Sequence, residues 1–342
     1  MSERVLTVRE LNRALLARQL LLERRKLSPA VAIERVGPLH AQGVESTYVN
    51  LWSRMEGFRR EQLTRAIERG TVVRSRPLRA TLHLTSARDY ALFLGAQRER
   101  RAEWWQRSTK HRYDEKTIAR AERVLAKAAA SPRTYAELVT AVGGDRFLAG
   151  VATIRLGVKT VAPAGTWGYH GTEDYVLGQK PADHATGMRR LVRCFFGAFG
   201  PATVDDLCFW ATLSKGDVAP FVEELDLRRF RDEQGRLLLD LPRAPLPPAD
   251  TPAPPRFLLR WDNLYLGHAS GARDRIVPPR LRKRVYTVNT VMPATFLVDG
   301  FVAGTWRQER DRVTIEPWRR LTRAERTSLK SELDGLADFL SG

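Results

Sequence analysis

The residues best suited to chemistry are His40 and Gln42, in the run Leu39-His40-Ala41-Gln42. In an extended backbone, residues two apart point to the same face, so the imidazole and the carboxamide can hold one water molecule between them. Two polar groups directed at one water indicate hydrolysis. The spacing alone is unspecific, because a histidine after a helix end often caps carbonyls and a loop glutamine is usually solvated.

Basic side chains alternate along a neighbouring segment that is predicted to form strands. Arg74, Arg76 and Arg79 are followed by Thr81 and His83, and alternate strand residues project to one face. This pattern favours contact with a phosphate backbone or with a nucleic-acid groove. The alternative is a solvated strand edge, where charge prevents unwanted strand pairing.

A second basic group surrounds the turn of a predicted hairpin at 228–239. Arg231 and Arg236 flank this turn together with Arg228 and Arg229, and they can either enter a groove or remain solvated. The basic run at 98–112 is typical of a solvated helix face and predicts general attraction only.

The charge balance indicates the partner. The 342 residues include 57 Lys and Arg against 39 Asp and Glu, a net charge of +18, and such a field attracts polyanions. A membrane surface is the competing polyanion, but the sequence shows neither a basic amphipathic helix with a continuous apolar face nor a lipidation signal. We therefore expect a nucleic-acid partner and no membrane partner.

The remaining composition points to a cytoplasmic protein without metal. Two cysteines, Cys194 and Cys208, exclude a disulfide framework and fit a reducing compartment. The six histidines lie far apart and none forms a metal-type pair with a cysteine. Residues 1–10 mix charges, and no stretch of about 18 uncharged apolar residues occurs.

The elements that must position His40 and Gln42 resemble repeated helix-and-hairpin units. Two or three helices followed by a hairpin predict a winged helix, and three such units are the interpretation we prefer. Predicted helices cover 7–25, from Ser28-Pro29 to Gly37-Pro38, 60–69, 87–107, 134–138, 147–156, 184–199, 203–210 and 218–225. Predicted hairpins cover 71–86, broken at Pro77, then 160–176 and 228–239.

A proline-rich segment separates these units from the end of the chain. Seven prolines lie within residues 242–255, which favours an extended linker. Strand-like runs then occupy 257–266, 285–291, 295–298, 301–306 and 312–316, closed by a helix at 323–340. We therefore predict an α+β chain with winged helices at 1–86, 87–180 and 181–241, a linker at 242–255, and a small β module with its closing helix at 256–342.

Several strings, taken together, resemble the bacterial DNA glycosylases of the AlkZ and YcaQ type, which are built from tandem winged-helix motifs. Their order and spacing span nearly the whole chain. The strings are Leu11-Asn12-Arg13, Ala17-Arg18-Gln19, Leu39 to Gln42, Leu51-Trp52-Ser53-Arg54, Arg79 to Leu84, Trp261 to His268, and Leu297 to Trp306.

The resemblance implies roles for particular residues. In that family a Gln-x-Gln or Gln-x-Asp motif positions the attacking water, and the matching positions here are His40 and Gln42, so histidine replaces the first glutamine. Asp262 either stabilises positive charge or pairs with an arginine. The residues expected to contact DNA are Arg54, Arg74, Arg76, Arg79, His83, Arg231, Arg236, Asp262, His268 and Arg273.

The implied activity is hydrolysis of the N-glycosidic bond of N-alkylated purines in double-stranded DNA. N7-alkylguanine, bulky natural-product adducts and interstrand crosslinks are the expected lesions, self-resistance is one expected role, and a monomer without cofactor or metal is expected. An alkylated purine is cationic and leaves as a neutral base, so positioning and electrostatics suffice. Gln42 would orient the water, and neutral His40 would accept its proton.

Two other functions fit part of the sequence. A non-catalytic winged-helix transcriptional regulator is expected to have the same charge, but regulators usually dimerise, and no heptad pattern suited to a dimer interface is present. An architectural or RNA-associated protein would bind regardless of damage. No lysine lies at the candidate water site, which speaks against a Schiff-base mechanism.

Overall fold

Local sequence signals set the first helices of the computed structural model, which describes residues 3–79, 81–287, 292–309 and 312–342. Thr7 and Glu10 form the predicted capping box of α1 (Val8–Arg18), and Ser28 caps α2 (Pro29–Val36), which begins at a proline. The neighbouring elements are β1 (Val5–Leu6), β2 (Leu39–His40), α3 (Val44–Trp52), α4 (Arg60–Glu68), β3 (Val72–Leu78) and β4 (Thr81–Ser86).

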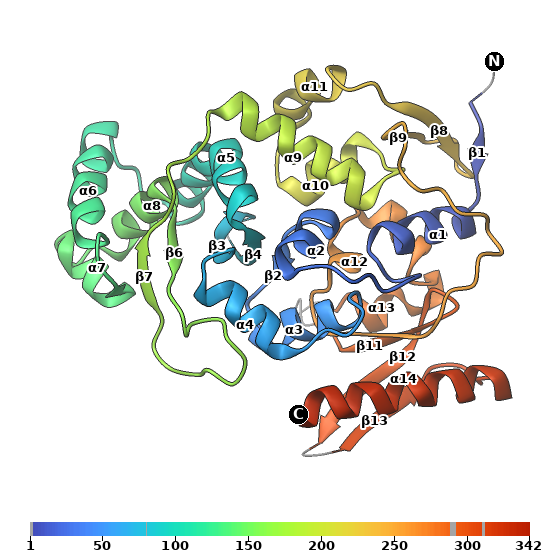
Figure 1. The fold of residues 1–342 in the computed structure, drawn as a ribbon. Helices are drawn as coiled ribbons and strands as arrows, with labels where there is room; N and C mark the ends of the chain where they lie inside the picture. Colours follow the sequence, from blue (N-terminus) through green and yellow to red (C-terminus); the bar gives the residue numbers. More distant parts are fainter. Residues whose placement is uncertain (1–2, 80, 288–291, 310–311) are drawn as a thin grey trace.

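The middle of the chain is mostly helical (Figure 1). Polar side chains cap these helices, for example Ser86 at α5 and Asp183 at α9. The elements are α5 (Ala87–Ser108), α6 (Glu115–Ala128), β5 (Arg133–Thr134), α7 (Tyr135–Ala141), α8 (Arg146–Leu156), β6 (Val158–Thr160), β7 (Asp174–Leu177), α9 (His184–Phe199), α10 (Val204–Ala211), α11 (Lys215–Glu223), β8 (Arg228–Asp232) and β9 (Leu237–Asp240).

One sheet joins the first two predicted modules. Within the described residues its strand order is β2-β4-β3-β6-β7-β5. Ser75 of β3 pairs with Lys159 of β6, so the two predicted wings are neighbours in a single sheet that crosses the predicted boundary at 86–87. This sheet carries the His40 motif on its β2 edge.

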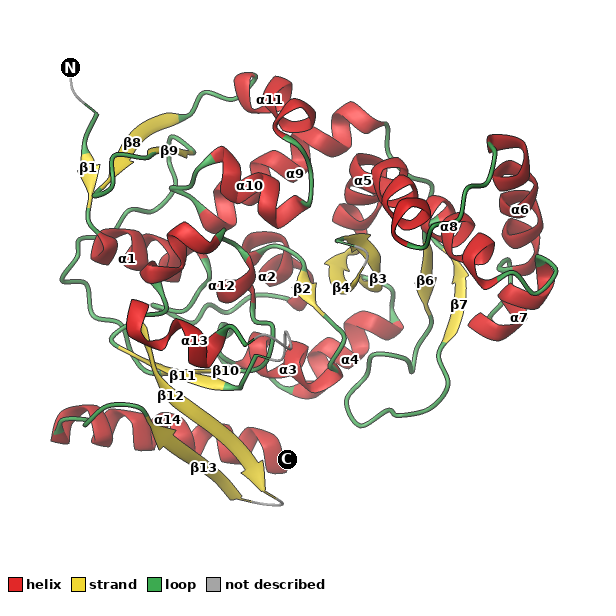
Figure 2. Cartoon of the chain, turned by 180° about the vertical axis from the view of Figure 1, so that it is seen from behind, coloured by secondary structure: helices red, strands yellow, loops and turns green. Residues whose placement is uncertain are grey.

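The N-terminal strand joins a sheet outside its predicted module. It pairs in parallel with β8, giving a sheet of order β1-β8-β9 at one end of the molecule (Figures 1 and 2). The segment 242–255, all of it described, contains neither helix nor strand. It lies against α1, because Arg9 Nε donates to the Ala249 carbonyl at 2.9 Å and Arg13 Nε to the Thr251 carbonyl at 2.7 Å.

The C-terminal part is a sheet with a covering helix. The sheet order is β10-β11-β12-β13, and α14 packs against β10 and β13 below the rest of the molecule (Figure 2). Its elements are β10 (Arg256–Leu258), α12 (Asn263–Leu266), the 3-10 turns at Ser270–Arg275 and Pro279–Leu281, α13 (Arg282–Val285), β11 (Thr295–Val298), β12 (Phe301–Glu309), β13 (Arg312–Pro317) and α14 (Arg323–Ser341).

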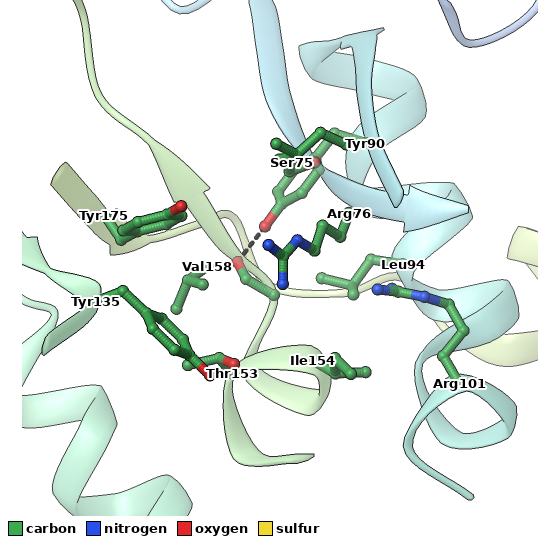
Figure 3. Close-up of a pocket in the computed structure, with 12 residues that line it drawn as sticks. Ser75, Arg76, Tyr90, Leu94, Arg101, Tyr135, Thr153, Ile154, Val158 and Tyr175 are labelled. Atoms are coloured by element: carbon green, nitrogen blue, oxygen red, sulfur yellow. Dashed lines mark hydrogen bonds between the residues drawn. The ribbon is translucent and has the colours of Figure 1, made fainter. Parts of the chain in front are cut away.

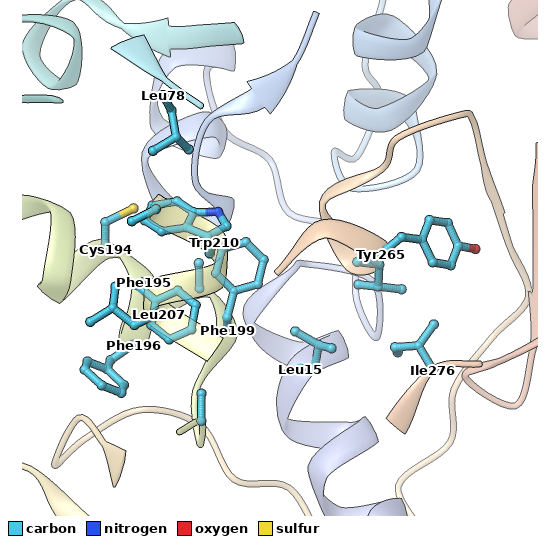
Figure 4. Close-up of a cluster of buried hydrophobic side chains, with 14 of the residues drawn as sticks. Leu15, Leu78, Cys194, Phe195, Phe196, Phe199, Leu207, Trp210, Tyr265 and Ile276 are labelled. Carbon is cyan, nitrogen blue, oxygen red and sulfur yellow. The ribbon is translucent and has the colours of Figure 1, made fainter. Parts of the chain in front are cut away.

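An aromatic core holds these parts together. Phe195 and Phe199 of α9 pack on Trp210 of α10, with ring centroids 5.5 and 5.7 Å apart. Figure 4 shows Leu15 of α1 and Tyr265 of α12 on the other side of this cluster. Burial of large aromatic side chains contributes strongly to stability, so α9 links the N-terminal and C-terminal segments.

The mixture of helices and sheets confirms the predicted α+β class, while the number of winged-helix modules remains a prediction. Several local predictions differ from the structure. The predicted strand at 257–266 ends at Leu258, and helix α12 occupies Asn263–Leu266. Pro77 does not break the hairpin but lies inside β3, where the pairing register shifts between Ser75 and Leu78, because a bulge tolerates a residue without an N–H. Val285 is helical rather than extended, and residues 288–291 lie outside the described part. Helices α3 and α6 were not predicted.

Candidate active site

Strand alternation determines which way the His40 motif faces. Leu39 and Ala41 are buried in a hydrophobic core, and the Ala41 N–H donates to the Leu82 carbonyl at 2.8 Å. Because neighbouring strand residues face opposite ways, His40 points away from the core that holds Leu39; β2 ends at His40, and Gln42 lies in the bend that follows. Gln42 is exposed, whereas His40 is only 7% exposed.

The His40 ring lies between two other rings. Its centroid is 5.6 Å from that of His83, edge to face, and 5.2 Å from that of Trp261. His40 Nδ1 is buried and has no hydrogen-bond partner among the described residues. Burial, aided by the charge of Arg79, lowers the pKa of His40 to about 4. His40 is therefore neutral at physiological pH and keeps a nitrogen available for hydrogen bonding.

His83 supports His40 from the neighbouring strand. The two residues pair directly across β2 and β4, and His83 is almost fully buried. Its Nδ1 donates to the Thr81 carbonyl at 2.8 Å, which leaves Nε2 as the acceptor. Burial, followed by the effect of His40, lowers the pKa of His83 well below its ordinary value. This placement makes His83 a neighbour of His40 rather than part of an exposed DNA surface.

Arg74 holds the backbone between the two motif residues. Its side chain is buried, with Nε donating to the Ala41 carbonyl at 3.2 Å and Nη1 to Glu173 at 2.6 Å. Gly165 makes room for it, since a Cβ there would lie 2.7 Å from Arg74 Cδ. Arg74 is thus placed to position the motif, and its guanidinium is committed to Ala41 and Glu173 rather than free to bind a phosphate.

Two guanidinium groups share an aromatic ring near His40. Arg79, which follows β3 with a φ of 55°, lies 5.5 Å from the Phe209 centroid, and Arg273 lies 5.4 Å from the same ring. Arg273 also stacks on Tyr286 at 4.0 Å. Neither arginine forms an ion pair within the described part of the chain. Their charge therefore stays available to an anion.

Three predicted DNA contacts are instead interior residues. Arg54 and Asp262 are fully buried and form a bidentate ion pair of 2.9 and 2.7 Å. His268 Nε2 lies 3.0 Å from the Phe199 carbonyl and 3.0 Å from Arg275 Nη1, and burial lowers its pKa to about 3. Because these side chains are held by partners inside the protein, they are not free to contact a DNA backbone, so these three assignments are corrected.

The basic hairpin lies on another sheet. Arg231 Nε pairs with Glu3 at 3.0 Å, and Arg236 Nε pairs with Asp232 at 2.6 Å. Both belong to β8, β9 or their turn, not to the sheet that carries His40. The structure therefore joins Arg79 and Arg273 to the His40 site, leaves Arg76 exposed on β3, and places Arg231 and Arg236 in local ion pairs.

Sequence reasoning missed three aromatic residues of this site. Trp261 was noted only inside a longer string, and its backbone is left-handed with a φ of 57°, a costly conformation for a large residue that often marks a functional site. Phe209 and Tyr286 carried no signal in the sequence beyond their type, because their pairing with arginines depends on tertiary contacts.

The described residues contain no group of three or more His, Cys, Asp or Glu side chains that could hold a metal. In that same part of the chain, no helix is both long and apolar enough to cross a membrane.

The site combines a neutral imidazole and an exposed glutamine with guanidinium groups that form no ion pair in the described part of the chain. On a strongly basic α+β protein, these features fit an enzyme that acts on nucleic acid. The family model of AlkZ-like DNA glycosylases matches residues 33–339. The chain therefore belongs to the AlkZ-like DNA glycosylase family, which confirms the resemblance and the predicted enzyme class.

The fold is also that of a solved glycosylase. Streptomyces sahachiroi DNA glycosylase AlkZ superimposes with a TM-score of 0.81 at 18% sequence identity, covering 96% of this chain and 95% of that one. A comparison with curated protein sequences finds no match.

Proposed function

We propose that this DNA glycosylase hydrolyses the N-glycosidic bond of N-alkylated purines in double-stranded DNA, using a water held by His40 and Gln42. N7-alkylguanine is the substrate class, bulky adducts and crosslinks included, and the enzyme acts as a monomer. The observation that carries this proposal is the neutral His40 ring, whose Nδ1 has no hydrogen-bond partner among the described residues, two positions from the exposed Gln42. Both groups are suited to positioning the attacking water rather than to protonating the leaving base.

The charge requirement of the reaction fits a neutral histidine. As the glycosidic bond breaks, the sugar gains positive charge, and a cationic group beside it would oppose this step. A neutral His40 avoids that repulsion and accepts the proton that the water loses when its oxygen bonds to the sugar carbon. Gln42 orients the same water through its side-chain carbonyl. The base leaves with the electron pair of the broken bond.

The position of the nearest lysine in the sheet favours hydrolysis over imine formation. Lys159 follows His40, His83 and Ser75 in one cross-strand row. Strands lie about 4.8 Å apart, so Lys159 starts roughly 14 Å from His40. A lysine nucleophile would have to contact the sugar carbon itself.

The test is release of free base from a duplex containing N7-methylguanine. We expect Gln42→Ala to abolish turnover while binding to the duplex changes little. The matched control is Gln179→Ala, at an exposed glutamine following β7, which should retain the parental rate. Parental turnover by Gln42→Ala would overturn the assigned role, and damage-independent binding without base release by the parent would favour a non-catalytic DNA-binding protein.

A further inference from the structure

A narrow cavity of about 30 Å³ lies beside the His40 site. It is enclosed by β3, α5, α7, α8 and the β6–β7 hairpin, and its walls include Tyr90, Tyr135 and Tyr175 (Figure 3). Figure 3 shows the Arg76 guanidinium among the lining side chains, with Arg101 reaching in from α5. The cavity therefore combines aromatic walls with two cationic groups.

Arg101 is a buried cation that forms no ion pair with any residue the structure describes. Its residue is 5% exposed, and its Nε and Nη2 have no hydrogen-bond partner among the described residues. The Oγ of Ser75, on the same cavity wall, is also buried and unpartnered in that part of the chain. Burial, followed by the charge of Arg76, lowers the pKa of Arg101 to about 9. An uncompensated buried charge is costly, so these unpartnered guanidinium donors are suited to binding an anion.

The neighbouring hydroxyl groups are already committed. Tyr90 donates its hydroxyl to the Gly157 carbonyl, shown as the dashed line in Figure 3, and Tyr175 donates to Glu173 at 2.8 Å. The Tyr90 and Tyr175 hydroxyls thus bond elsewhere. The donors of Arg101 and Ser75, which line the cavity, have no protein acceptor in the described structure. The cavity thus presents donors, which is the requirement for binding an oxyanion.

The cavity is connected to the His40 motif by the sheet. Ser75 pairs with His83, and His83 pairs with His40, so the three side chains project from the same face. Two strand spacings place Ser75 roughly 10 Å from His40. The charge of Arg101 also acts on His83. A DNA strand with its damaged nucleotide at His40 would bring a nearby phosphate within reach of the cavity.

We propose that Arg101, Arg76 and Ser75 form a pocket for one phosphate of the DNA strand that carries the damaged nucleotide; this rests on the proposed function. A guanidinium group offers paired donors in the geometry of phosphate oxygens. The cavity is too narrow for a nucleobase or an adduct, since pockets for such ligands measure about 300 Å³ or more. The phosphate anchors the strand while the sugar faces the water at His40.

Binding to a duplex with a tetrahydrofuran abasic analogue tests this proposal without turnover. In a series of such duplexes, one phosphate of the strand at a time is replaced by an uncharged methylphosphonate. We expect one position near the analogue to weaken binding by the full-length parent about tenfold, and Arg101→Met to weaken binding of the unmodified duplex by a similar factor. In the Arg101→Met variant, the same methylphosphonate should not weaken binding further, because both changes remove the same contact between Arg101 and the phosphate.

Arg107→Met is the matched control. Arg107 lies on the same helix with a side chain that is 58% exposed, so the variant loses one charge without opening the cavity. It should bind within about twofold of the parent and keep the full methylphosphonate effect. The proposal would be overturned if Arg101→Met and Arg107→Met lost the same amount of duplex affinity. It would also be overturned if the effect of Arg101→Met added to that of every methylphosphonate.

Stability and a second variant separate a binding role from a structural one. Arg101→Met removes an unpaired buried charge and should leave the melting temperature unchanged or higher; a clear decrease would identify Arg101 as structural and contradict the pocket. Ser75→Ala, which barely alters the volume, should weaken binding about threefold at the same phosphate and provides the test if Arg101→Met does not fold. An unchanged methylphosphonate profile for Ser75→Ala would count against the pocket.

Inorganic phosphate distinguishes the two sources of the anion. Saturable binding of inorganic phosphate that depends on Arg101, with duplex affinity independent of Arg101, would assign the pocket to a free anion and overturn the strand contact. Competition of phosphate with the duplex at the Arg101-sensitive position would support it. These binding measurements do not involve base release. They can therefore be interpreted even if Gln42 proves not to be a catalytic residue.

Discussion

His40 and His83 lie directly opposite each other on antiparallel strands, with ring centroids 5.6 Å apart and planes inclined by 78°. Burial lowers the pKa of both rings; the charge of Arg79 adds to this effect at His40, and His40 adds to it at His83. Burial in this pair therefore keeps position 40 neutral, whereas an exposed histidine would titrate near its ordinary pKa of about 6.5. This relationship connects the local sheet pairing to the proposed chemistry.

The first prediction concerns the pH dependence of base release. His40 has a pKa of about 4, so the rate with an N7-methylguanine duplex should be constant from about pH 8 to about pH 6 and should fall as pH approaches about 4. His40→Gln keeps hydrogen bonding but cannot be protonated, so its rate should not fall in that range. Circular dichroism at each pH checks that the protein stays folded. A parental rate that halves near pH 6.5 would contradict a neutral, buried His40.

The second prediction concerns stability and pH. Between the folded pKa of His40, about 4, and its ordinary value of 6.5, the unfolded chain binds a proton that the folded protein does not. The free energy of unfolding should therefore be highest above about pH 6.5 and decrease as pH falls towards about 4, by on the order of 3 kcal/mol for His40 alone. His83 and His268, with lowered pKa values, add the same trend.

Urea unfolding at about pH 7 and about pH 4.5 measures this difference. His40→Gln removes one of the three groups and should narrow the gap between the two pH values. The same substitution at His170, an exposed residue before β7, is the control and should leave the gap unchanged. An equal gap in His40→Gln and the parent would show that His40 does not contribute.

The sequence was most informative where local rules decide the structure. The capping box at Thr7, the proline start of α2 and the turn at residues 233–236 depend on nearby residues and were predicted correctly. Helix α3 was missed because residues 44–52 mix polar, β-branched and aromatic types without a clear helical stripe, and its core contacts come from distant segments.

Site assignments that depended on charge alone were less reliable. An arginine in the sequence looks the same whether it meets DNA or a buried carboxylate, and Arg54 finds Asp262 from 208 residues away. The expectation that His40 and Gln42 share one face stays a prediction, because β2 ends at His40 and Gln42 lies in the following bend. The ring contacts of Trp261 and Phe209 could not be predicted, since they arise only when distant segments pack together.

The third prediction tests Arg74 as a positioning residue. Arg74→Met removes the bond to the Ala41 carbonyl, so Gln42 and His40 should lose their alignment. We expect kcat to fall by about tenfold or more while KM changes little, because misplaced groups cost rate more than binding. Glu173→Gln removes the ion pair but leaves the Ala41 bond, and it should keep most of the activity. Similar kcat losses in both variants would assign the effect to the ion pair.

The fourth prediction concerns the cations that share Phe209. Arg79→Met and Arg273→Met each remove one charge near His40, so each should weaken duplex binding and reduce the slope of log K against log salt concentration by about one. Arg189→Met, at an exposed residue paired with Glu224, is the control and should leave the slope unchanged. A parental slope in the Arg79 and Arg273 variants would exclude them from phosphate contact.

The fifth prediction concerns the buried ion pair of Arg54 and Asp262, two residues that were expected from the sequence to contact DNA. Asp262→Ala leaves the Arg54 guanidinium buried without its partner, which should lower the free energy of unfolding by about 3–5 kcal/mol in urea titrations. Glu224→Ala breaks an exposed ion pair with Arg189 and should cost less than about 1 kcal/mol. Replacing both buried partners, Arg54→Met with Asp262→Leu, should recover part of the loss, since no charge is then stranded. If Asp262→Ala changed stability little but weakened DNA binding strongly, Asp262 would be a DNA-contact residue after all.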